Sequence, residues 1–423
     1  MRGIFRDNLW INKLTADSLI YFLGKIIPSL LGFFTIIMLS RIFGKETYGQ
    51  FSIILTIILA SQIIFSGWIL QGILRFFSES HSVSQKEFVN SVWRISYFTS
   101  FIGAVVLMGI LFLLNKDDLL IIIFSIILFV LIMAFSIQST FFQAKLQSRK
   151  YIYWDSIRAL CIPLFTVLLY LLFRNKSCKI ILSGYSLAYI CVVFFMISLK
   201  DNNELRLKEP FRKDVFKNLF KYGMPLTLWL GSSYLLNVSD RYVIAIYHSY
   251  GDVGVYSAAY DIITRGLGVL FIPIINAAHP IIMDRWNKGD YESSIKVIKA
   301  GLIYEVGIFV PVAIIILIFR KSLVLFGLGP EFADASDIIF PIALGSFFWR
   351  LSMLIHKPLE LDKKVLTMAV LVFIALASNL GLNFYFIPRF GYNAAAYTTL
   401  GSFFIYFIGV IIYILSRKRK SPG

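Results

Sequence analysis

The sequence of 423 residues is short of charge: 15% of its residues are Asp, Glu, Lys or Arg, whereas 58% are hydrophobic and the mean hydropathy is +0.76. A soluble domain of this size carries roughly a quarter charged residues. The deficit excludes a surface that faces only water. Uncharged runs such as residues 52–74 have the length that crosses a bilayer as a helix, about twenty residues, and many of them follow one another. The composition therefore predicts a polytopic membrane protein.

Residues suited to metal binding or catalysis are also few. The three cysteines show neither ligand spacing nor a disulfide framework, and the four histidines are scattered without a His-x-x-x-His pair. A glycine-rich Lys-Ser/Thr loop for phosphate is missing from the sequence. We therefore expect a protein that is not an enzyme, with no cofactor and no metal site.

The apolar runs, separated by turn and charge signals, predict twelve transmembrane helices and hence an all-α fold. They lie near residues 19–40, 49–74, 91–113, 119–142, 156–173, 180–199, 222–247, 253–282, 296–319, 335–356, 365–387 and 393–416. The first run follows basic residues but lacks a small-residue cleavage site, so we expect a retained first span and not a signal peptide.

The net charge is +17, from 41 Lys and Arg against 24 Asp and Glu. In a soluble protein this excess would suggest nucleic acid. Here 27 of the 41 basic residues fall in loops on the side of both termini, and nine fall on the opposite side. This asymmetry predicts cytoplasmic termini and no nucleic-acid partner.

The longest connection between spans divides them into six and six. We expect an N-terminal six-helix lobe at 1–200, a basic cytoplasmic linker at 201–221 and a C-terminal six-helix lobe at 222–423. Apolar residues of the linker share one helical face, so it is expected either as an amphipathic helix in the membrane interface or as an extension of the seventh span. Short motifs recur at equivalent places: Tyr48-Gly49 opens the second span and Gly254-Val-Tyr256 the eighth. This recurrence favours two related halves.

Five basic residues fall outside the loops counted above, and three carboxylates lie at comparable depth in the predicted spans, although a charge at mid-membrane costs at least about 2.5–3.5 kcal/mol. They are Lys25, Arg94, Asp240, Arg241, Asp261, Arg265, Glu305 and Arg350. Such residues normally face a bundle interior or an aqueous cavity. The five cations and three carboxylates suit a cavity for an anion, phosphate in particular.

Several of these charges also have a purely structural interpretation. Lys25 can snorkel to the cytoplasmic interface. Asp261 and Arg265 have the spacing of an intrahelical ion pair, and Asp240-Arg241 can mark the outer interface.

The carboxylates among these charges are candidates for coupling to a proton or sodium ion. Glu305 has no partner on its own helix, so we expect a protonated carboxyl and prefer it as the ion-coupling residue, with Asp240 and Asp261 as further candidates. Arg94 and Arg350 are expected to be interfacial anchors.

Three groups of motifs resemble the Wzx-type polysaccharide flippases. The first is Leu39-Ser-Arg-Ile-Phe-Gly44, followed by Tyr48-Gly-Gln-Phe51. The second is Tyr222-Gly-Met-Pro225, with Ser239-Asp-Arg-Tyr242 and Gly254-Val-Tyr-Ser-Ala-Ala-Tyr260 after it. The third is Asn383-Phe-Tyr-Phe-Ile-Pro388, followed by residues 390–399. These motifs occur in the family's order over nearly the whole chain.

The resemblance implies the multidrug/oligosaccharidyl-lipid/polysaccharide (MOP) exporter fold, with two six-helix lobes around a central cavity. It implies flipping of an undecaprenyl-diphosphate-linked oligosaccharide from the cytoplasmic to the periplasmic leaflet of the bacterial inner membrane, for O-antigen, lipopolysaccharide or capsule. Protons or sodium would drive it by counterflow. The family's cationic cavity residues correspond to Lys25, Arg241 and Arg265 here. A polysaccharide polymerase and a chain-length regulator are the expected protein partners, besides membrane lipids.

Three alternatives stay open. A cation-coupled drug antiporter of the same fold would have a more acidic or apolar cavity. A polytopic polysaccharide polymerase would show a large periplasmic loop, which the sequence lacks. A membrane scaffold would have its intramembrane charges paired or snorkelled.

Overall fold

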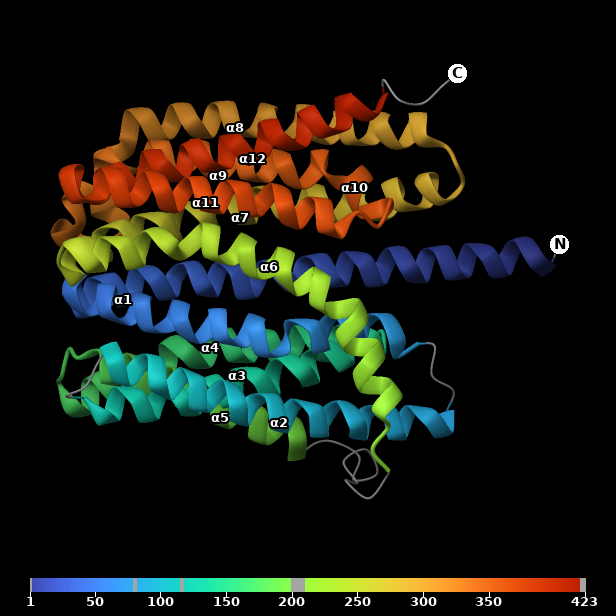
Figure 1. Cartoon of the computed structure of the whole chain (residues 1–423), viewed down its shortest axis with the longest axis horizontal. Coiled ribbons are helices and arrows are strands. Elements are labelled where there is room, and N and C mark those ends of the chain that lie inside the picture. Colours follow the sequence, from blue (N-terminus) through green and yellow to red (C-terminus); the bar gives the residue numbers. More distant parts are fainter. Residues whose placement is uncertain (1, 79–81, 115–117, 199–209, 419–423) are drawn as a thin grey trace. The chain divides into compact units, whose positions relative to one another are not determined.

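The computed structural model describes the backbone of residues 2–78, 82–114, 118–198 and 210–418, and the side chains of 26–78, 85–114, 118–198 and 210–416. Within these residues the chain is helical and contains no strand (Figure 1). The elements are α1 (Arg2–Phe76), α2 (Ser82–Leu114), α3 (Leu119–Ala144), α4 (Ser148–Phe173), α5 (Cys178–Ser198), α6 (Lys213–Tyr247), α7 (Tyr250–Asn287), α8 (Tyr291–Gly327), the 3₁₀ helix η1 (Pro330–Asp337), α9 (Ile339–Ile355), α10 (Lys357–Leu361), α11 (Val365–Phe390) and α12 (Tyr392–Lys418).

The predicted all-α polytopic fold is confirmed. Nine described helices are long and apolar enough to cross a membrane, or ten if η1 and α9, which meet at a bend of 60°, form one span. α1 covers two predicted spans, because Gly44 inside it is non-helical at φ 74° and ψ 175°. α6 covers the seventh predicted span, although it is not among the helices apolar enough to be counted. Counted in this way, the helices coincide with all twelve predicted spans.

The side chains on the helix surfaces fit a lipid environment. Phe101, Leu113 and Ile303 are exposed by 69%, 73% and 71%. Large apolar side chains exposed in such numbers over many helices would be a liability in water. In a bilayer they face acyl chains, so these helices belong to a multi-pass membrane protein.

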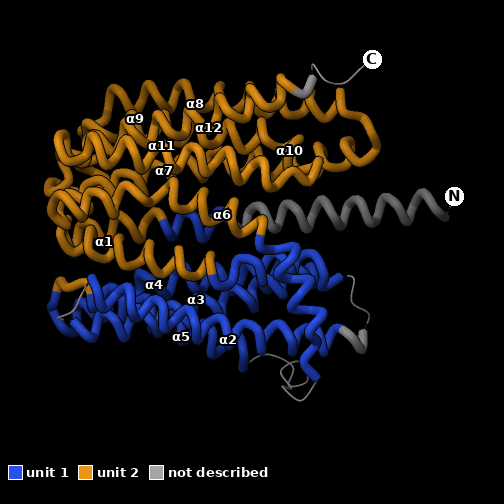
Figure 2. The backbone as a smooth tube through the Cα atoms, viewed as in Figure 1, with its two compact units in different colours: residues 1–32, 65–175, 179–224 blue, residues 33–64, 176–178, 225–423 orange. Residues whose placement is uncertain are grey.

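The described chain forms two compact units, coloured separately in Figure 2. Unit 1 comprises residues 1–32, 65–175 and 179–224, and unit 2 comprises 33–64, 176–178 and 225–423. Residues 33–64 of α1 therefore pack with the C-terminal helices. The lobe boundaries expected from the sequence stay a prediction.

The expected linker lies partly outside the described residues, which omit 199–209. α6 begins at Lys213 and continues without a break to Tyr247, so residues 213–221 extend the seventh span. Val215 and Leu219 are buried in the core of unit 1, while Lys217 is exposed. The extension is thus amphipathic, and its place in the membrane interface stays a prediction.

In unit 2, α7, α8, α9, α11 and α12 pack together, with η1 against α7, α8 and α9. The apolar core between α9, α11 and α12 contains Val372, Phe403 and Tyr406. A second core joins α7, α8 and α9 through Ile282, Ile298 and Leu354. These helices hold in place the intramembrane charges described next.

Candidate functional site

An ion pair between α6 and α7 lies at the centre of the polar residues of unit 2. The Arg241 guanidinium donates from Nη2 to Oδ1 of Asp261 at 2.6 Å. It also donates from Nη1 to the Ser52 hydroxyl of α1 at 2.6 Å. The Arg241 side chain is only 5% exposed, so its charge depends on these partners for stabilisation.

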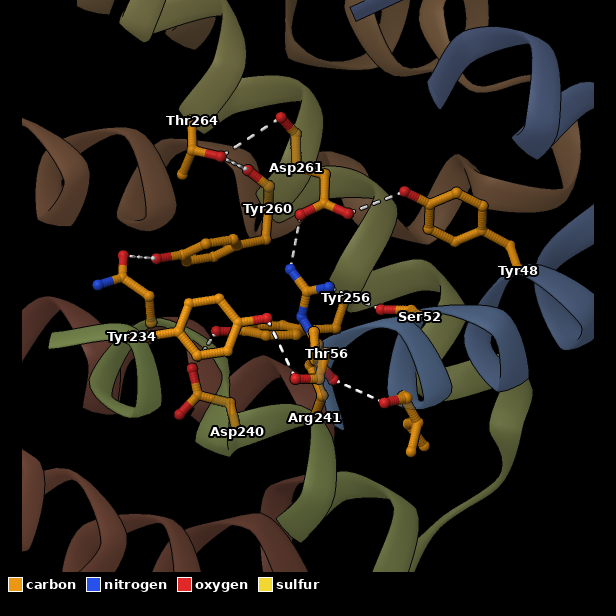
Figure 3. Close-up of polar contacts among 12 residues, drawn as sticks. Tyr48, Ser52, Thr56, Tyr234, Asp240, Arg241, Tyr256, Tyr260, Asp261 and Thr264 are labelled. Atoms are coloured by element: carbon orange, nitrogen blue, oxygen red, sulfur yellow. Dashed lines mark hydrogen bonds and ion pairs between the residues drawn. The ribbon is translucent and has the colours of Figure 1, made fainter. Parts of the chain in front are cut away.

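Asp261 joins this pair to α1. The Tyr48 hydroxyl donates to Oδ2 of Asp261 at 2.9 Å, while Oδ1 accepts from Arg241. Figure 3 shows the carboxylate between the two donors. One carboxylate thus fixes three helical segments, in α1, α6 and α7.

Aromatic residues surround Arg241. The ring of Tyr260 lies 5.7 Å from the guanidinium carbon, a cation–π distance, and its hydroxyl donates to Asn237 at 2.8 Å. The Tyr242 hydroxyl donates to the side chain of Thr56. The hydroxyl of Tyr234, labelled with Thr56 in Figure 3, donates to the Thr56 carbonyl. Arg241 therefore lies among neutral hydroxyls and aromatic rings, which add no charge next to its guanidinium.

Two glycines allow α1 and α7 to approach closely enough for these contacts. A Cβ added to Gly49 would lie 1.9 Å from the carbonyl oxygen of Tyr250, and one added to Gly254 would lie 1.9 Å from that of Lys45. Only a residue without a side chain fits either position. The glycines of the motifs at the second and eighth spans thus place Tyr48 and Ser52 beside the ion pair.

Asp240 points to a different set of partners from its neighbour Arg241. Its buried carboxylate accepts hydrogen bonds from Tyr256 of α7, Asn383 of α11 and Thr399 of α12. All three donors are neutral. Oxygen atoms of carboxylate, hydroxyl and amide groups are also the ligands of hard cations, so this cluster could bind a proton or a sodium ion.

A second amide extends the Asp240 cluster. Asn383 donates to Asn379 at 2.9 Å, and Asn379 accepts from Ser239 at 2.8 Å. The amide nitrogen of Asn379 has no hydrogen-bond partner within the described residues. The role of the Asp240 cluster in ion coupling stays a prediction.

Arg265 does not form the intrahelical pair that the sequence allows, because Asp261 binds Arg241 instead. Its side chain is exposed, and no described residue makes an ion pair or hydrogen bond with it. An apolar cavity of about 720 Å³ opens along the same stretch of α7, lined by Ile262 and Gly266 there and by Phe33 and Phe319 of α1 and α8. The unpaired guanidinium of Arg265 thus lies on the same stretch of α7 as residues that line an apolar cavity.

The remaining predicted site residues lie apart from the ion pair. Glu305 of α8 is fully buried, and neither carboxylate oxygen has a hydrogen-bond partner among the described residues. Arg350 of α9, expected to be an anchor at the interface, interacts electrostatically with Glu305. The side chain of Lys25 lies outside the described residues.

Sequence reasoning missed the uncharged members of the site. Tyr48, Ser52 and Tyr260 contact the ion pair, and Asn383 and Thr399 contact Asp240. All except Ser52 lie within the motifs that carried the family resemblance. Hydroxyls and amides inside apolar spans were the available signal, but they are too common in membrane helices to select these five.

Comparisons with known proteins agree with the motifs. A model of the polysaccharide biosynthesis protein family matches residues 14–286. An uncharacterized membrane protein of Methanocaldococcus jannaschii is 22% identical over 262 residues, 61% of this chain and 52% of that protein. A protein of the Lsg locus of Haemophilus influenzae is 26% identical over 250 residues, 58% of this chain and 60% of that protein. The matched region thus spans little more than half the length of these curated relatives.

Two solved structures share the fold. The lipid II flippase MurJ in an inward closed conformation superposes with a TM-score of 0.74 at 16% identity, covering 94% of this chain and 87% of that chain. An inward-facing multidrug resistance MATE family transporter of the MOP superfamily gives a TM-score of 0.74 at 11% identity, covering 96% of this chain and all of that chain (100%). At these identities the likeness shows the fold alone, and it confirms the MOP fold predicted from the motifs.

Proposed function

Since the chain belongs to the polysaccharide biosynthesis protein family, we propose that it flips an undecaprenyl-diphosphate-linked oligosaccharide from the cytoplasmic to the periplasmic leaflet of the bacterial inner membrane. Both termini would then lie in the cytoplasm. The product would serve O-antigen, capsule or a related surface polysaccharide, and a polymerase would use it on the periplasmic side. The family match and the MOP fold support a membrane transporter of lipid-linked saccharides in general, and the residues below support the particular substrate.

The observation that carries the proposal is Arg265, an exposed guanidinium within a transmembrane helix and without a described partner. A guanidinium in a partly desolvated site binds diphosphate oxygens through two parallel hydrogen bonds. The apolar cavity lined by neighbouring Ile262 and Gly266 offers room for part of a prenyl chain. An anion with a long hydrophobic tail therefore matches this combination better than a cationic drug does.

The sequence suggested Arg241 as a substrate-binding residue, but we propose a structural role for it. Its charge is already balanced by Asp261, and Ser52 accepts a second hydrogen bond from it, so Arg241 positions helices in this structure. It could meet the substrate only after Asp261 released it. Lys25 stays a candidate for the sugar or diphosphate on sequence grounds.

The direct test uses cells in which this gene is deleted. Lipid-linked repeat units are expected to accumulate on the cytoplasmic leaflet, and surface polysaccharide to be lost. The wild-type gene should reverse both effects and Arg265→Ala should not. Lys288→Ala is the matched control, because Lys288 is exposed next to the end of α7 and forms only a surface ion pair with Asp284.

The opposite result would decide against the proposal. If neither lipid pool changes in a strain without a second flippase, the protein does not flip this substrate. Export of cationic dyes by the same strain would then be measured, since a drug antiporter is the next function that the fold supports.

A further inference from the structure

Glu305 is a fully buried carboxylate of α8 in unit 2. Neither of its oxygens has a hydrogen-bond partner among the described residues. The two other carboxylates singled out inside the membrane are satisfied: Asp240 accepts three neutral hydrogen bonds, and Asp261 is ion-paired. An ionised carboxylate without donors or a paired cation is costly in an apolar interior. The neutral acid is therefore the form that fits this position.

A cation lies near Glu305 without binding it. Arg350 of α9 interacts electrostatically with Glu305, but the two form no salt bridge. The guanidinium lies against α7 at Gly268, where an added Cβ would be 3.3 Å from its Nη2 atom. Gly268 thus leaves room for Arg350 at a distance from Glu305.

Other charged groups around α8 are occupied or remote. α7, α9 and η1 pack against α8, and Arg350 is the charged residue of α9. On α7, Asp261 is paired and Arg265 is exposed. On η1, Glu331 binds a backbone N–H of α1 and Asp337 an arginine of α8. Within the described part of the chain, Arg350 is therefore the cation that can respond to the charge of Glu305.

Arg350 also connects Glu305 to the ion pair of α6 and α7. It interacts electrostatically with Tyr260, whose ring lies 5.7 Å from the guanidinium carbon of Arg241. Tyr260 thus interacts with two guanidinium groups. A movement of Arg350 would change the electrostatic surroundings of Tyr260 and of the Arg241–Asp261 pair.

We infer that Glu305 is a proton-binding site and that Arg350 reports its occupancy to the Arg241–Asp261 pair. With the proton bound, Glu305 is neutral and Arg350 stays beside Gly268, as described here. When the proton leaves, the carboxylate attracts Arg350 into an ion pair and away from Tyr260. The O–H bond of Glu305 breaks, and a water molecule accepts the proton and forms a new O–H bond. The inference rests on the proposed function for its purpose, since the proton would drive transport.

Infrared difference spectroscopy tests the proton site without any substrate. The full-length protein is reconstituted in vesicles of phosphatidylethanolamine and phosphatidylglycerol and titrated between acid and alkaline pH in H₂O and D₂O. A carboxylic C=O band that shifts in D₂O is expected in the wild type and in Glu292→Gln, an exposed control on the same helix. The band should be missing from Glu305→Gln. In Arg350→Gln it should persist to higher pH by about one unit or more, because a nearby cation favours the ionised form.

A band of equal size in Glu305→Gln and the wild type would overturn the inference. If Glu305→Gln fails to accumulate in the membrane, Arg350→Gln still decides, since an unchanged titration in that variant also overturns it. The melting temperature of each variant shows whether it is folded.

A transport measurement separates this inference from the proposed function. In the deletion strain, Glu305→Gln is expected to leave lipid-linked units on the cytoplasmic leaflet, while Glu292→Gln restores flipping. Full activity of Glu305→Gln would overturn the inference and leave the flippase proposal intact. Failure of the wild type to flip would overturn the proposed function, and the infrared band would still report on Glu305.

Discussion

The close approach of α1 and α7 predicts that Gly49→Ala destabilises unit 2 strongly. The added Cβ would lie 1.9 Å from the carbonyl oxygen of Tyr250 and 2.7 Å from the backbone nitrogen of Gly254. Both atoms belong to the backbone of α7, so no side-chain rotation relieves the overlap. Reaching an ordinary contact distance requires the two helices to separate by about 1.5 Å.

The magnitude follows from two opposing effects. Alanine favours a helix over glycine by about 1 kcal/mol. Overpacking typically costs about 1–3 kcal/mol where the surroundings can adjust, and two helix backbones adjust less easily than side chains. We therefore expect a net loss of at least about 2 kcal/mol in the free energy of unfolding. Separation would also move Tyr48 and Ser52 away from the ion pair, so flipping should fall as well.

The assay is thermal unfolding of the detergent-solubilised full-length protein, followed by size-exclusion fluorescence. Gly401→Ala is the matched control, because no atom lies within 4 Å of its added Cβ and it is also inside a helix of unit 2. The control should melt at or above the wild-type temperature. Gly49→Ala combined with Gly254→Ala should cost less than the sum of the two single changes, since both open the same gap. A Gly49→Ala protein that melts with the wild type would refute the close approach.

Three further predictions concern charged residues. Asp261→Asn should cost about 3–5 kcal/mol in the free energy of unfolding, because it leaves the buried charge of Arg241 unpaired. A melting temperature restored by adding Arg241→Gln would confirm this cause, and equal melting temperatures of Asp261→Asn and the wild type would contradict it. Asp240→Asn should abolish any dependence of melting temperature on sodium that the wild type shows, and a sodium dependence that persists would exclude the Asp240 cluster as a sodium site. At the start of α8, the side chain and backbone N–H of Ser293 hold the pKa of Asp290 below its ordinary value. The stabilising effect of Asp290 is thus present at neutral pH and lost as pH falls through its lowered pKa. Asp290→Ala should therefore lower the melting temperature at neutral pH and have less effect in acid. A loss of melting temperature that does not depend on pH would contradict this.

The helices could be predicted from the sequence because the bilayer imposes a simple rule. A run of about twenty residues without charge has to be helical where no water is available to its backbone. The turn at Gly44 was marked by Arg41 and Lys45 on either side of it, and the structure places a non-helical residue there. Each predicted span coincides with a helix because of this local rule.

The pairing of charges could not be predicted, because it depends on contacts between helices. Periodicity places Asp261 and Arg265 on one face of α7, and the spacing of four favours their interaction. The structure instead joins Asp261 to Arg241, 20 residues away on α6, at 2.6 Å. The sequence contains no signal for the register between α6 and α7, which side-chain packing sets.

The lack of a partner could be predicted better than hydrogen bonds from neutral donors. Glu305 was expected to lack a partner on its own helix, and the structure leaves both of its carboxylate oxygens without one among the described residues. Asp240 is a candidate for ion coupling with an interfacial position as the alternative, and the structure shows it fully buried under hydroxyl and amide donors from three helices. Neutral donors carry no pattern of charge, so sequence reasoning about ion pairs does not detect them.

These pairings change what the count of intramembrane charges means for anion binding. Five cations against three carboxylates suggested a broadly positive cavity. In the described part of unit 2, however, Asp261 neutralises Arg241, and Arg350 is only partly exposed and lies beside Gly268. Arg265 is exposed, so it carries the positive charge most accessible to a diphosphate. It follows that Arg265→Ala should impair flipping more than Arg350→Ala does.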